Sequence, residues 1–139
     1  MNSATGQIGI GVGALIINER NQVLLMKRGS KSRNRVGYWT IPGGKIEFGE
    51  RLSDAVIREV QEELGVHLEI KKLLQVCDDL IPEEKQHWVS VLFLCKCYGV
   101  PSNKEPAKCE IVQWFDLNML PSLLTTPTQT AIDAYLLQN

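Results

Sequence analysis

The chain carries almost no net charge, because 15 lysine and arginine residues are balanced by 16 aspartate and glutamate residues. This balance gives no reason to expect long-range attraction to nucleic acid or to a membrane surface. A long apolar run is also missing. The run at residues 8–17 is too short to span a bilayer, and no positive residue precedes it as a secretory signal would require. We therefore expect a cytoplasmic protein with neither a membrane nor a nucleic-acid partner.

Cysteine is scarce, and its four residues are Cys77, Cys95, Cys97 and Cys109. A chain of 139 residues is not a small disulfide-rich domain, so we expect reduced thiols. A single Cys-x-Cys pair is poor spacing for zinc, which favours structural roles. The length suits one well-buried domain and is too short for two, and no repeat or low-complexity tract occurs. We predict a single domain over residues 1–139.

An amphipathic helix is predicted over residues 53–64. Val56, Val60 and Leu64 recur at intervals of four and form an apolar face, and Gly65 is typical of a C-terminal stop. Three acidic side chains occupy another face, because a rotation of about 100° per residue spreads them over one side of about a single turn. These acidic residues are Glu59, Glu62 and Glu63.

The three glutamates repel one another strongly enough to favour a bound cation. Two unit charges about 4 Å apart repel by roughly 1 kcal/mol in water and by about 4 kcal/mol at an effective dielectric constant of 20. Oxygen ligands select a hard cation, Mg²⁺ or Mn²⁺, which can contact phosphate oxygens at the same time. Arg58 lies four residues before Glu62 and is placed to pair with it, and Glu50 adds a fourth carboxylate from a loop. Gly43 and Gly44 let the backbone approach a ligand closely.

An ordinary solvated helix face would also explain these charges. The longer spacing argues against that explanation, because seven identities in register arise by chance with a probability on the order of 10⁻⁸ at residue frequencies of roughly one in fifteen. This stretch, residues 44–66, resembles the complete signature of the Nudix family. The signature consists of Gly44, five free positions, Glu50, seven free positions, Arg58-Glu59, apolar Val60, one free position, Glu62-Glu63, one free position, Gly65 and apolar Val66, and Trp39, Pro42 and Gly43 resemble its lead-in.

The resemblance implies a fold and a reaction. The fold is the family's α/β type, a three-layer α/β/α sandwich with a mixed β-sheet. Nudix enzymes hydrolyse a nucleoside diphosphate linked to another moiety, with Mg²⁺ as cofactor and Mn²⁺ as a substitute. Carried over by position, Glu59 and Glu63 are the principal metal ligands, and Glu62 is a further ligand or the general base. Glu50 holds metal-bound water or assists as base, the Gly43 carbonyl completes the ligand set, and Arg58 joins the catalytic group by directing Glu62.

Charged residues outside the signature are candidates for metal or phosphate binding, and each has a non-functional alternative. Family members often use one more acid from a later loop, for which Glu110 is the candidate and Glu105 the second choice; a plain surface acid is the alternative. Lys27 and Arg28 are candidates for phosphate binding, since they lie at the end of a predicted strand. The alternative for their basic stretch, residues 27–35, is a solvated loop.

Aromatic side chains are candidates to stack on a nucleobase. For Trp88 a place in the core is equally open, because its strand face also holds Ser90 and Lys96. Glycines at positions 9, 11 and 13 leave room for a ligand or a neighbouring strand to lie close to the sheet. The predicted substrate contacts are Lys27, Arg28, Trp39, Gly44, Phe48 and Trp88, with Tyr38 as a further aromatic candidate.

The other elements are predicted from alternation and turn residues. The segment at residues 87–98 is apolar on both faces and is therefore expected to be the central strand. The last helix is expected to begin with Thr126 as N-cap and Pro127 at its first position, and to bury Ala131, Ile132, Tyr135 and Leu136. The full set is a hairpin of strands at 7–17 and 22–27, an extended segment at 37–41, strands at 68–77, 87–98 and 111–115, and polar loops at 78–86 and 99–108.

The resemblance leaves the substrate open. The Phe48-Gly49-Glu50 segment is similar to MutT-like enzymes and favours a nucleoside triphosphate, cleaved to a monophosphate and pyrophosphate. Pro82, sixteen residues beyond Val66, lies near a proline of ADP-ribose pyrophosphatases, so ADP-ribose or a nucleotide sugar is the alternative. A catalytically silent nucleotide sensor and an RNA-cap hydrolase are further alternatives, opposed by the intact acids and by the balanced charge. A homodimer through a sheet edge is also open.

Overall fold

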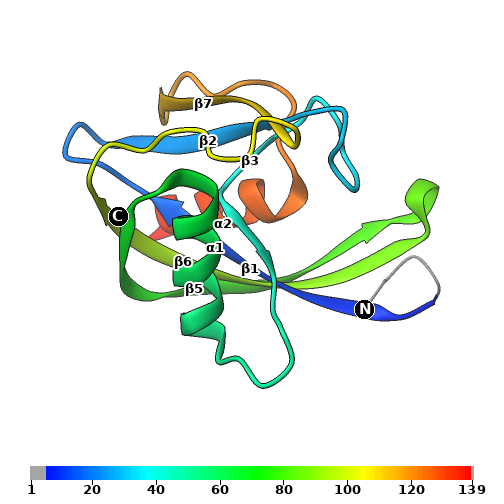
Figure 1. Ribbon diagram of the computed structural model, residues 1–139. Coiled ribbons are helices and arrows are strands. Elements are labelled where there is room, and N and C mark those ends of the chain that lie inside the picture. The colour runs from blue at the N-terminus through cyan, green and yellow to red at the C-terminus, as the bar shows by residue number, and fades with distance from the viewer. Residues whose placement is uncertain (1–5, 139) are drawn as a thin grey trace.

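The computed structural model describes residues 6–138, and within them the chain forms two β-sheets and two α-helices (Figure 1). The larger sheet has the strand order β4-β1-β6-β5, and the smaller one has the order β3-β2-β7. The larger sheet is mixed, because β1 pairs with β6 in parallel and the other pairs are antiparallel. The elements are β1 (Ile8–Ile16), β2 (Gln22–Arg28), β3 (Trp39–Thr40), β4 (Gly43–Lys45), α1 (Leu52–Leu64), β5 (His67–Ile81), the 3₁₀ turn η2 (Pro82–Glu84), β6 (Gln86–Tyr98), β7 (Cys109–Asp116) and α2 (Thr126–Leu137).

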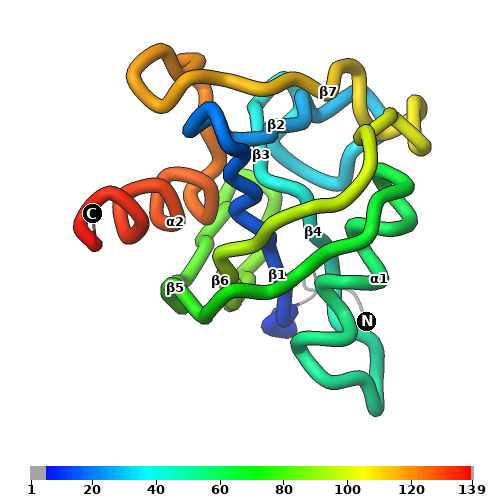
Figure 2. The backbone as a smooth tube through the Cα atoms, turned by 90° about the vertical axis from the view of Figure 1, so that its left-hand side faces the viewer, coloured from blue at the N-terminus to red at the C-terminus, as the bar shows by residue number. Residues whose placement is uncertain are grey.

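The two helices cover opposite faces of the larger sheet (Figure 2). On β6, Val91 and Phe93 pack in the cluster that contains the buried face of α1, whereas Leu92 packs in the cluster that contains α2. The prediction of a central strand that is apolar on both faces is confirmed, since β6 lies between β1 and β5. The predicted three-layer α/β/α arrangement is likewise confirmed.

Helix α1 forms for the local reasons that the sequence indicates. Its buried side chains are Ala55, Val56, Val60 and Leu64, which lie along one face. The helix ends at Gly65, which adopts the left-handed conformation with φ +70° and donates its N–H to the Gln61 carbonyl at 2.9 Å. The observed start at Leu52 is one residue earlier than predicted.

The predicted hairpin of β1 and β2 is wrong. The two strands share only an isolated bridge between Ile17 and Val23, and β2 lies in the smaller sheet between β3 and β7. The turn itself is tight, because the Asn18 side chain accepts hydrogen bonds from the backbone of Arg20 and Gln22, both at 2.9 Å. Four consecutive residues of β2 are buried, so their backbone N–H and C=O groups need hydrogen-bond partners within the protein, and β3 and β7 pair with the strand on either edge.

The predicted polar loop at residues 78–86 is also wrong for most of its length. Strand β5 continues through Asp78 and Asp79, which pair with Val89 and Trp88 of β6, and only η2 and Lys85 connect the two strands. Cross-strand pairing therefore overrides the polar composition. The prediction placed the end of β5 at residue 77, whereas its observed last residue is Ile81.

Helix α2 departs from the prediction at both ends. Thr125, not Thr126, is the N-cap, so that Pro127 occupies the second helical position. Ala131 and Ile132 are buried as predicted and Tyr135 packs beside them, but the predicted burial of Leu136 is wrong, because its side chain is 49% exposed. Neither helix described within residues 6–138 is long and apolar enough to span a membrane.

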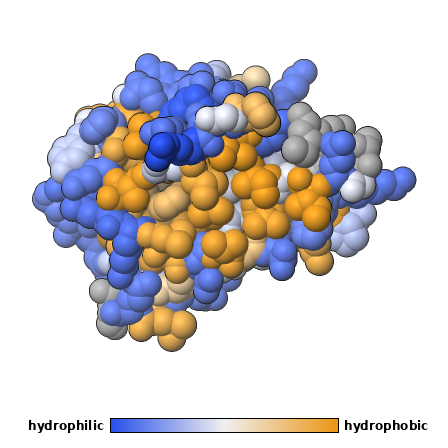
Figure 3. Space-filling model, turned by 90° about the horizontal axis from the view of Figure 1, so that it is seen from below, coloured by the Kyte–Doolittle hydropathy of each residue, from blue (hydrophilic) through white to orange (hydrophobic). Residues whose placement is uncertain are grey.

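Strand β5 is an edge of the larger sheet and exposes large apolar side chains. Leu73, Val76 and Leu80 are each about half exposed. Apolar side chains also gather on the face of the molecule seen from below (Figure 3). Exposed apolar surface on an edge strand is where a second chain would pair, and the homodimer stays a prediction.

Candidate active site

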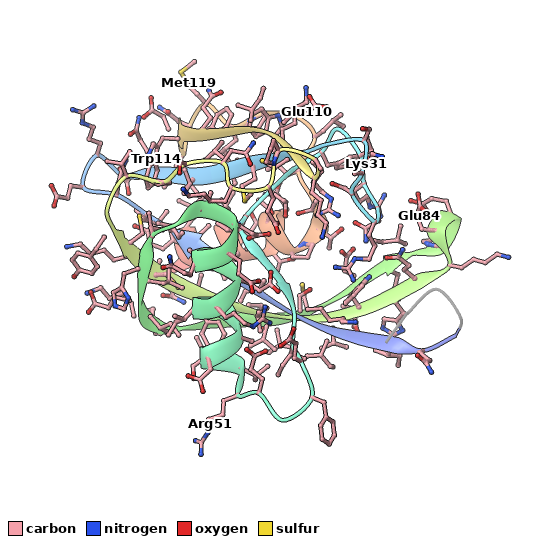
Figure 4. The ribbon with its side chains drawn as sticks, in the orientation of Figure 1. Lys31, Arg51, Glu84, Glu110, Trp114 and Met119 are labelled. Atoms are coloured by element: carbon pink, nitrogen blue, oxygen red, sulfur yellow. The ribbon has the colours of Figure 1, made fainter. Side chains whose placement is uncertain are left out.

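A cleft of about 570 Å³ lies between the larger sheet, strand β2 and the segment that joins β2 to β3. Gly11 and Gly13 of β1 line it, as the sequence predicted for positions where a ligand lies close to the sheet. Acids from α1 and bases from β2 and its following loop share this cleft, and Figure 4 shows Lys31 on that loop. Its charged walls include Glu47, Glu59, Glu62, Glu63, Glu105, Lys27, Arg28, Lys31, Arg33 and Lys108.

The backbone of Gly43 and Gly44, before α1, lies against the carboxylates of Glu63 and Glu59. The Gly43 N–H donates a hydrogen bond to Glu63 Oε1 at 2.9 Å, and this holds the carboxylate against strand β4. A Cβ atom on Gly44 would overlap the carboxylate of Glu59, so only glycine leaves this carboxylate room. The two glycines thus set the positions of Glu59 and Glu63.

Arg58 holds three carboxylates together. Its Nε and Nη2 atoms donate to the two oxygens of Glu50 at 2.7 and 3.0 Å, while Nη1 donates to Glu59 at 2.9 Å and to Glu62 at 3.0 Å. The predicted pairing with Glu62 is confirmed. The hydrogen bond from Arg58 lowers the pKa of Glu50, and the same bond raises the pKa of Arg58. Neither Glu50 nor Arg58 is among the residues that line the cleft, but Arg58 links Glu50 to Glu59 and Glu62, which do line it.

The carboxylates that face the cleft are held in an unfavourable electrostatic state. Burial raises the pKa of Glu59 and raises the pKa of Glu63 well above its ordinary value. The Glu105 carboxylate raises both pKa values further, against the opposing effects of Arg58 on Glu59 and of the Gly43 N–H on Glu63. Crowded, partly buried anions of this kind are stabilised by a cation.

The oxygen atoms do not yet converge on a common point. Among residues 6–138, no group of three or more His, Cys, Asp or Glu side chains is already gathered around a metal position. Oxygens of Glu59 and Glu62 turn to Arg58 instead, and Glu63 turns to Gly43. The donor set nevertheless suits a hard divalent cation, because it is made of oxygen alone, lies in one cleft and carries unneutralised negative charge.

Some of the predicted phosphate and metal contacts outside α1 line the cleft, and others do not. Lys27 and Arg28 line the cleft, and burial lowers the pKa of Arg28. Glu110, the first candidate for an additional metal ligand, is not among the lining residues; it extends from β7 (Figure 4) and lies 3.9 Å from Lys27. Glu105, the second candidate, does line the cleft.

The structure brings one of the predicted aromatic contacts to the cleft. Trp88 is only 8% exposed and lines it, so that both predicted locations, core and pocket, apply at once. Trp39 packs edge-on against Phe115, with ring centroids 4.9 Å apart, and does not line the cleft. Phe48 is fully exposed on the loop before α1, and Tyr38 lies beneath the Arg35 guanidinium. Base stacking by Trp39 or Phe48 therefore has no contact in the cleft to support it.

The basic loop between β2 and β3 is tied to the sheet through a residue that sequence reasoning missed. The Oε1 atom of buried Gln86 accepts hydrogen bonds from Asn34 at 2.7 Å and from Trp88 at 2.8 Å. Its Nε2 atom donates to the Arg33 carbonyl at 3.3 Å, and the Arg33 guanidinium lies 4.8 Å from the Trp88 ring centroid. Its composition placed Gln86 in the predicted polar loop. The only sequence feature that indicated burial was its position directly before an apolar strand.

Comparison with known proteins assigns the chain to a family. The model of the NUDIX domain matches residues 8–138. A solved MutT Nudix hydrolase from Burkholderia pseudomallei superposes with a TM-score of 0.85 and 38% identity, over 92% of this chain and 98% of that one. The MutT protein of Methanosarcina mazei Go1 superposes with a TM-score of 0.80 and 26% identity, over 95% of each chain.

Curated relatives are similar over part of their length. An ADP-ribose pyrophosphatase from Methanocaldococcus jannaschii is 35% identical over 108 residues, which are 78% of this chain and 62% of that protein. The human 8-oxo-dGDP phosphatase NUDT18 is 32% identical over 114 residues, which are 80% of this chain and 33% of that protein. The chain thus spans less than two thirds of either relative. The family model, the solved MutT structures and the intact signature on α1 agree: the chain belongs to the Nudix hydrolase family.

Proposed function

We propose that the chain is a Mg²⁺-dependent pyrophosphohydrolase that cleaves a nucleoside triphosphate to a nucleoside monophosphate and pyrophosphate, with Mn²⁺ as a substitute cation. The observation that carries this proposal is the cleft itself. Glu59, Glu62 and Glu63 line it together with Lys27 and Arg28, so one cavity offers oxygen ligands for a cation and cations for phosphate oxygens. The named relatives support a nucleotide substrate, since one is an 8-oxo-dGDP phosphatase and another an ADP-ribose pyrophosphatase.

The proposed roles of the residues are those that the resemblance to the family implies, and the contacts of Glu59, Glu62 and Glu63 support them. Glu59 and Glu63 are the principal ligands to the metal, positioned by Gly44 and Gly43, and the Gly43 carbonyl is the backbone ligand. When bound, the divalent cation neutralises phosphate charge and lowers the pKa of the attacking water. Glu62 is a further ligand or accepts the proton of that water. Arg58 is a positioning residue that orients Glu59 and Glu62 and is itself fixed by Glu50.

The second candidate is the hydrolysis of ADP-ribose or a nucleotide sugar. The archaeal relative favours it by its name. Pro82, the sequence feature that suggested it, begins the η2 turn and is not among the residues that line the cleft. Since the cleft has no contribution from this proline, the triphosphate stays the first choice.

The test is Mg²⁺-dependent product release from nucleoside triphosphates, modified triphosphates, ADP-ribose and nucleotide sugars. Glu63→Gln removes one charge from the buried ligand, and Glu84→Gln is the control because Glu84 is exposed on η2, away from the cleft (Figure 4). We expect pyrophosphate from triphosphates, at least about 100-fold less of it with Glu63→Gln, and no change with Glu84→Gln.

Other outcomes would replace the proposal. Cleavage of ADP-ribose or a nucleotide sugar alone would establish the second candidate. Tight nucleotide binding without turnover of any substrate would identify a nucleotide sensor. Unchanged turnover in Glu63→Gln would remove Glu63 from the metal site.

A further inference from the structure

Asp79, near the end of β5, is a cleft residue with an unpaired buried side-chain atom. The residue is 7% exposed and lines the cleft, and its Oδ1 atom is buried without a hydrogen-bond partner. Among residues 6–138 it is the only buried side-chain nitrogen or oxygen atom in this state. Buried polar atoms in folded proteins are nearly always paired, so an orphaned acceptor on a cavity wall points to a donor that arrives with a ligand.

The neighbouring cations do not satisfy this oxygen. Arg35 pairs with Glu83 at 2.9 Å, and Arg28 donates its Nε–H to the Asn34 carbonyl at 2.8 Å. Burial raises the pKa of Asp79, and this effect exceeds the opposing charges of Arg35 and Arg28 and the hydrogen bond of Thr126. The Asp79 carboxyl thus lies near positive charge, but its Oδ1 atom stays buried and unpaired at the cleft wall.

Trp88 lies beside this unpaired acceptor. Asp79 and Trp88 are directly opposite in the antiparallel ladder of β5 and β6, so their side chains leave the same face of the sheet. The indole is fixed by its hydrogen bond to Gln86 at 2.8 Å and by close packing on Gly9. Gly11 of β1 leaves the adjacent floor of the cleft without a side chain. A planar ring in the cleft would meet the indole, the Arg33 guanidinium 4.8 Å from the indole centroid, and the Asp79 carboxyl beside them.

Arg28 connects this end of the cleft with the acidic end. Its pKa is affected by the charges of both Glu63 and Asp79, so the guanidinium lies within electrostatic range of both carboxylates. Phosphates held near Glu63 and Arg28 would therefore place the other end of the same molecule toward Asp79 and Trp88.

We propose that Asp79 and Trp88 form the nucleobase subsite, in which Asp79 Oδ1 accepts a hydrogen bond from the amino group of the base. This inference rests on the proposed function and names its substrate class: nucleotides of cytosine, adenine or guanine. The carboxylate disfavours uracil, which presents a carbonyl oxygen in place of the amino group of cytosine, because an oxygen facing Oδ1 is repelled. It disfavours hypoxanthine relative to guanine because hypoxanthine has a hydrogen atom on carbon in place of the 2-amino group and leaves Oδ1 without this donor.

The experiment compares substrates that differ in this group. The kcat/KM values for CTP and UTP, and for GTP and inosine triphosphate, are measured on the full chain. The native chain should prefer the amino-bearing member of each pair by about 10- to 100-fold, the range for one hydrogen bond to a charged group. Asp79→Ala should bring both ratios close to one. Asp78→Asn is the matched control, because Asp78 is the adjacent acid and its side chain is 74% exposed.

The outcomes separate this inference from the proposed function. Equal kcat/KM values within both pairs in the native chain, with turnover present, would overturn the subsite and leave the hydrolase intact. If no triphosphate is cleaved, the dissociation constants of the same nucleotide pairs are measured by calorimetry in place of kcat/KM. A binding preference that depends on Asp79 would then support the subsite even though the proposed hydrolase activity had failed. If Asp79→Ala fails to fold, Asp79→Asn, of the same shape, takes its place and should reduce the ratios. Ratios unchanged in a folded Asp79 variant would contradict the inference.

Discussion

A methyl group added at Gly9 tests the packing of the cleft wall. The Cβ atom of Gly9→Ala would lie 2.5 Å from Cζ3 and 2.6 Å from Cε3 of Trp88. Carbon atoms pack best at about 3.5–4.0 Å, so roughly 1 Å of separation must be created. The indole cannot yield freely, because Gln86 holds its Nε1 atom and the Arg33 guanidinium lies over its ring.

The expected cost follows from overpacking of a buried site. Such changes destabilise proteins by about 1–3 kcal/mol, and the loss of chain entropy in the unfolded state on replacing glycine offsets up to about 1 kcal/mol. A net loss of about 1–2 kcal/mol corresponds to a decrease in melting temperature of about 3–7 °C for a chain of this length. Thermal unfolding followed by circular dichroism measures it.

Gly11→Ala is the matched control on the same strand. Its Cβ would meet the Gly44 carbonyl oxygen at 3.5 Å and the Ser90 hydroxyl at 3.6 Å, which are ordinary contacts, so the melting temperature should stay the same or rise. In a Trp88→Leu background, Gly9→Ala should no longer destabilise the fold, because the clashing ring is gone. Equal melting temperatures for Gly9→Ala and Gly11→Ala would refute the reasoning.

Three more predictions concern other parts of the structure. Gly44→Ala should lower Mg²⁺-dependent kcat by about 10-fold or more while changing the melting temperature little, because its Cβ displaces the flexible carboxylate of Glu59 and not the backbone; steady-state kinetics and thermal unfolding test this. Burial raises the pKa of Cys95 to about 12, so labelling by iodoacetamide at pH 8 should be slow in the folded chain and fast in urea. Burial also raises the pKa of Asp79, so the folded state binds this proton more tightly than the unfolded state does. The native chain therefore loses stability as the pH rises above about 4, the ordinary pKa of an aspartate. The melting temperature of Asp79→Asn minus that of the native chain should increase between pH 4 and pH 7.

The acid-bearing helix could be predicted from the sequence because its determinants are local. Apolar residues at intervals of four define the buried face, and Gly65 ends the helix with its own backbone conformation. The contact between Arg58 and Glu62 follows from the same geometry, since residues four apart lie on one side of a helix. The additional contacts of Arg58 with Glu50 depend on how the preceding loop folds back, which no spacing rule specifies.

The pairing of strands is harder to predict from the sequence, because it depends on which distant segments pair with each other. Strand β2 follows β1 after a short turn, as a hairpin partner would, yet it pairs with β7 from Gln22 to Arg28 and lies in the other sheet. Asp79 and Gln86 have the composition of a loop but are buried in the paired strands, since β5 continues to Ile81 and β6 begins at Gln86. Trp88 of the proposed nucleobase subsite was a candidate from the sequence, but the burial of Asp79 and Gln86 beside it could not be predicted without the register of these strands.

The parallel pairing of β1 with β6 also constrains the order of folding. The ladder joins Ile8 to His87 and Ile16 to Cys95, so the middle of the larger sheet is built from opposite halves of the chain. During synthesis the first strand is made long before its partner, and closing so large a loop carries an entropy cost that local contacts do not repay. The β5–β6 ribbon, whose strands are adjacent in sequence, can form early, and docking of β1 onto it would then be a late step in folding, one that completes the floor of the cleft.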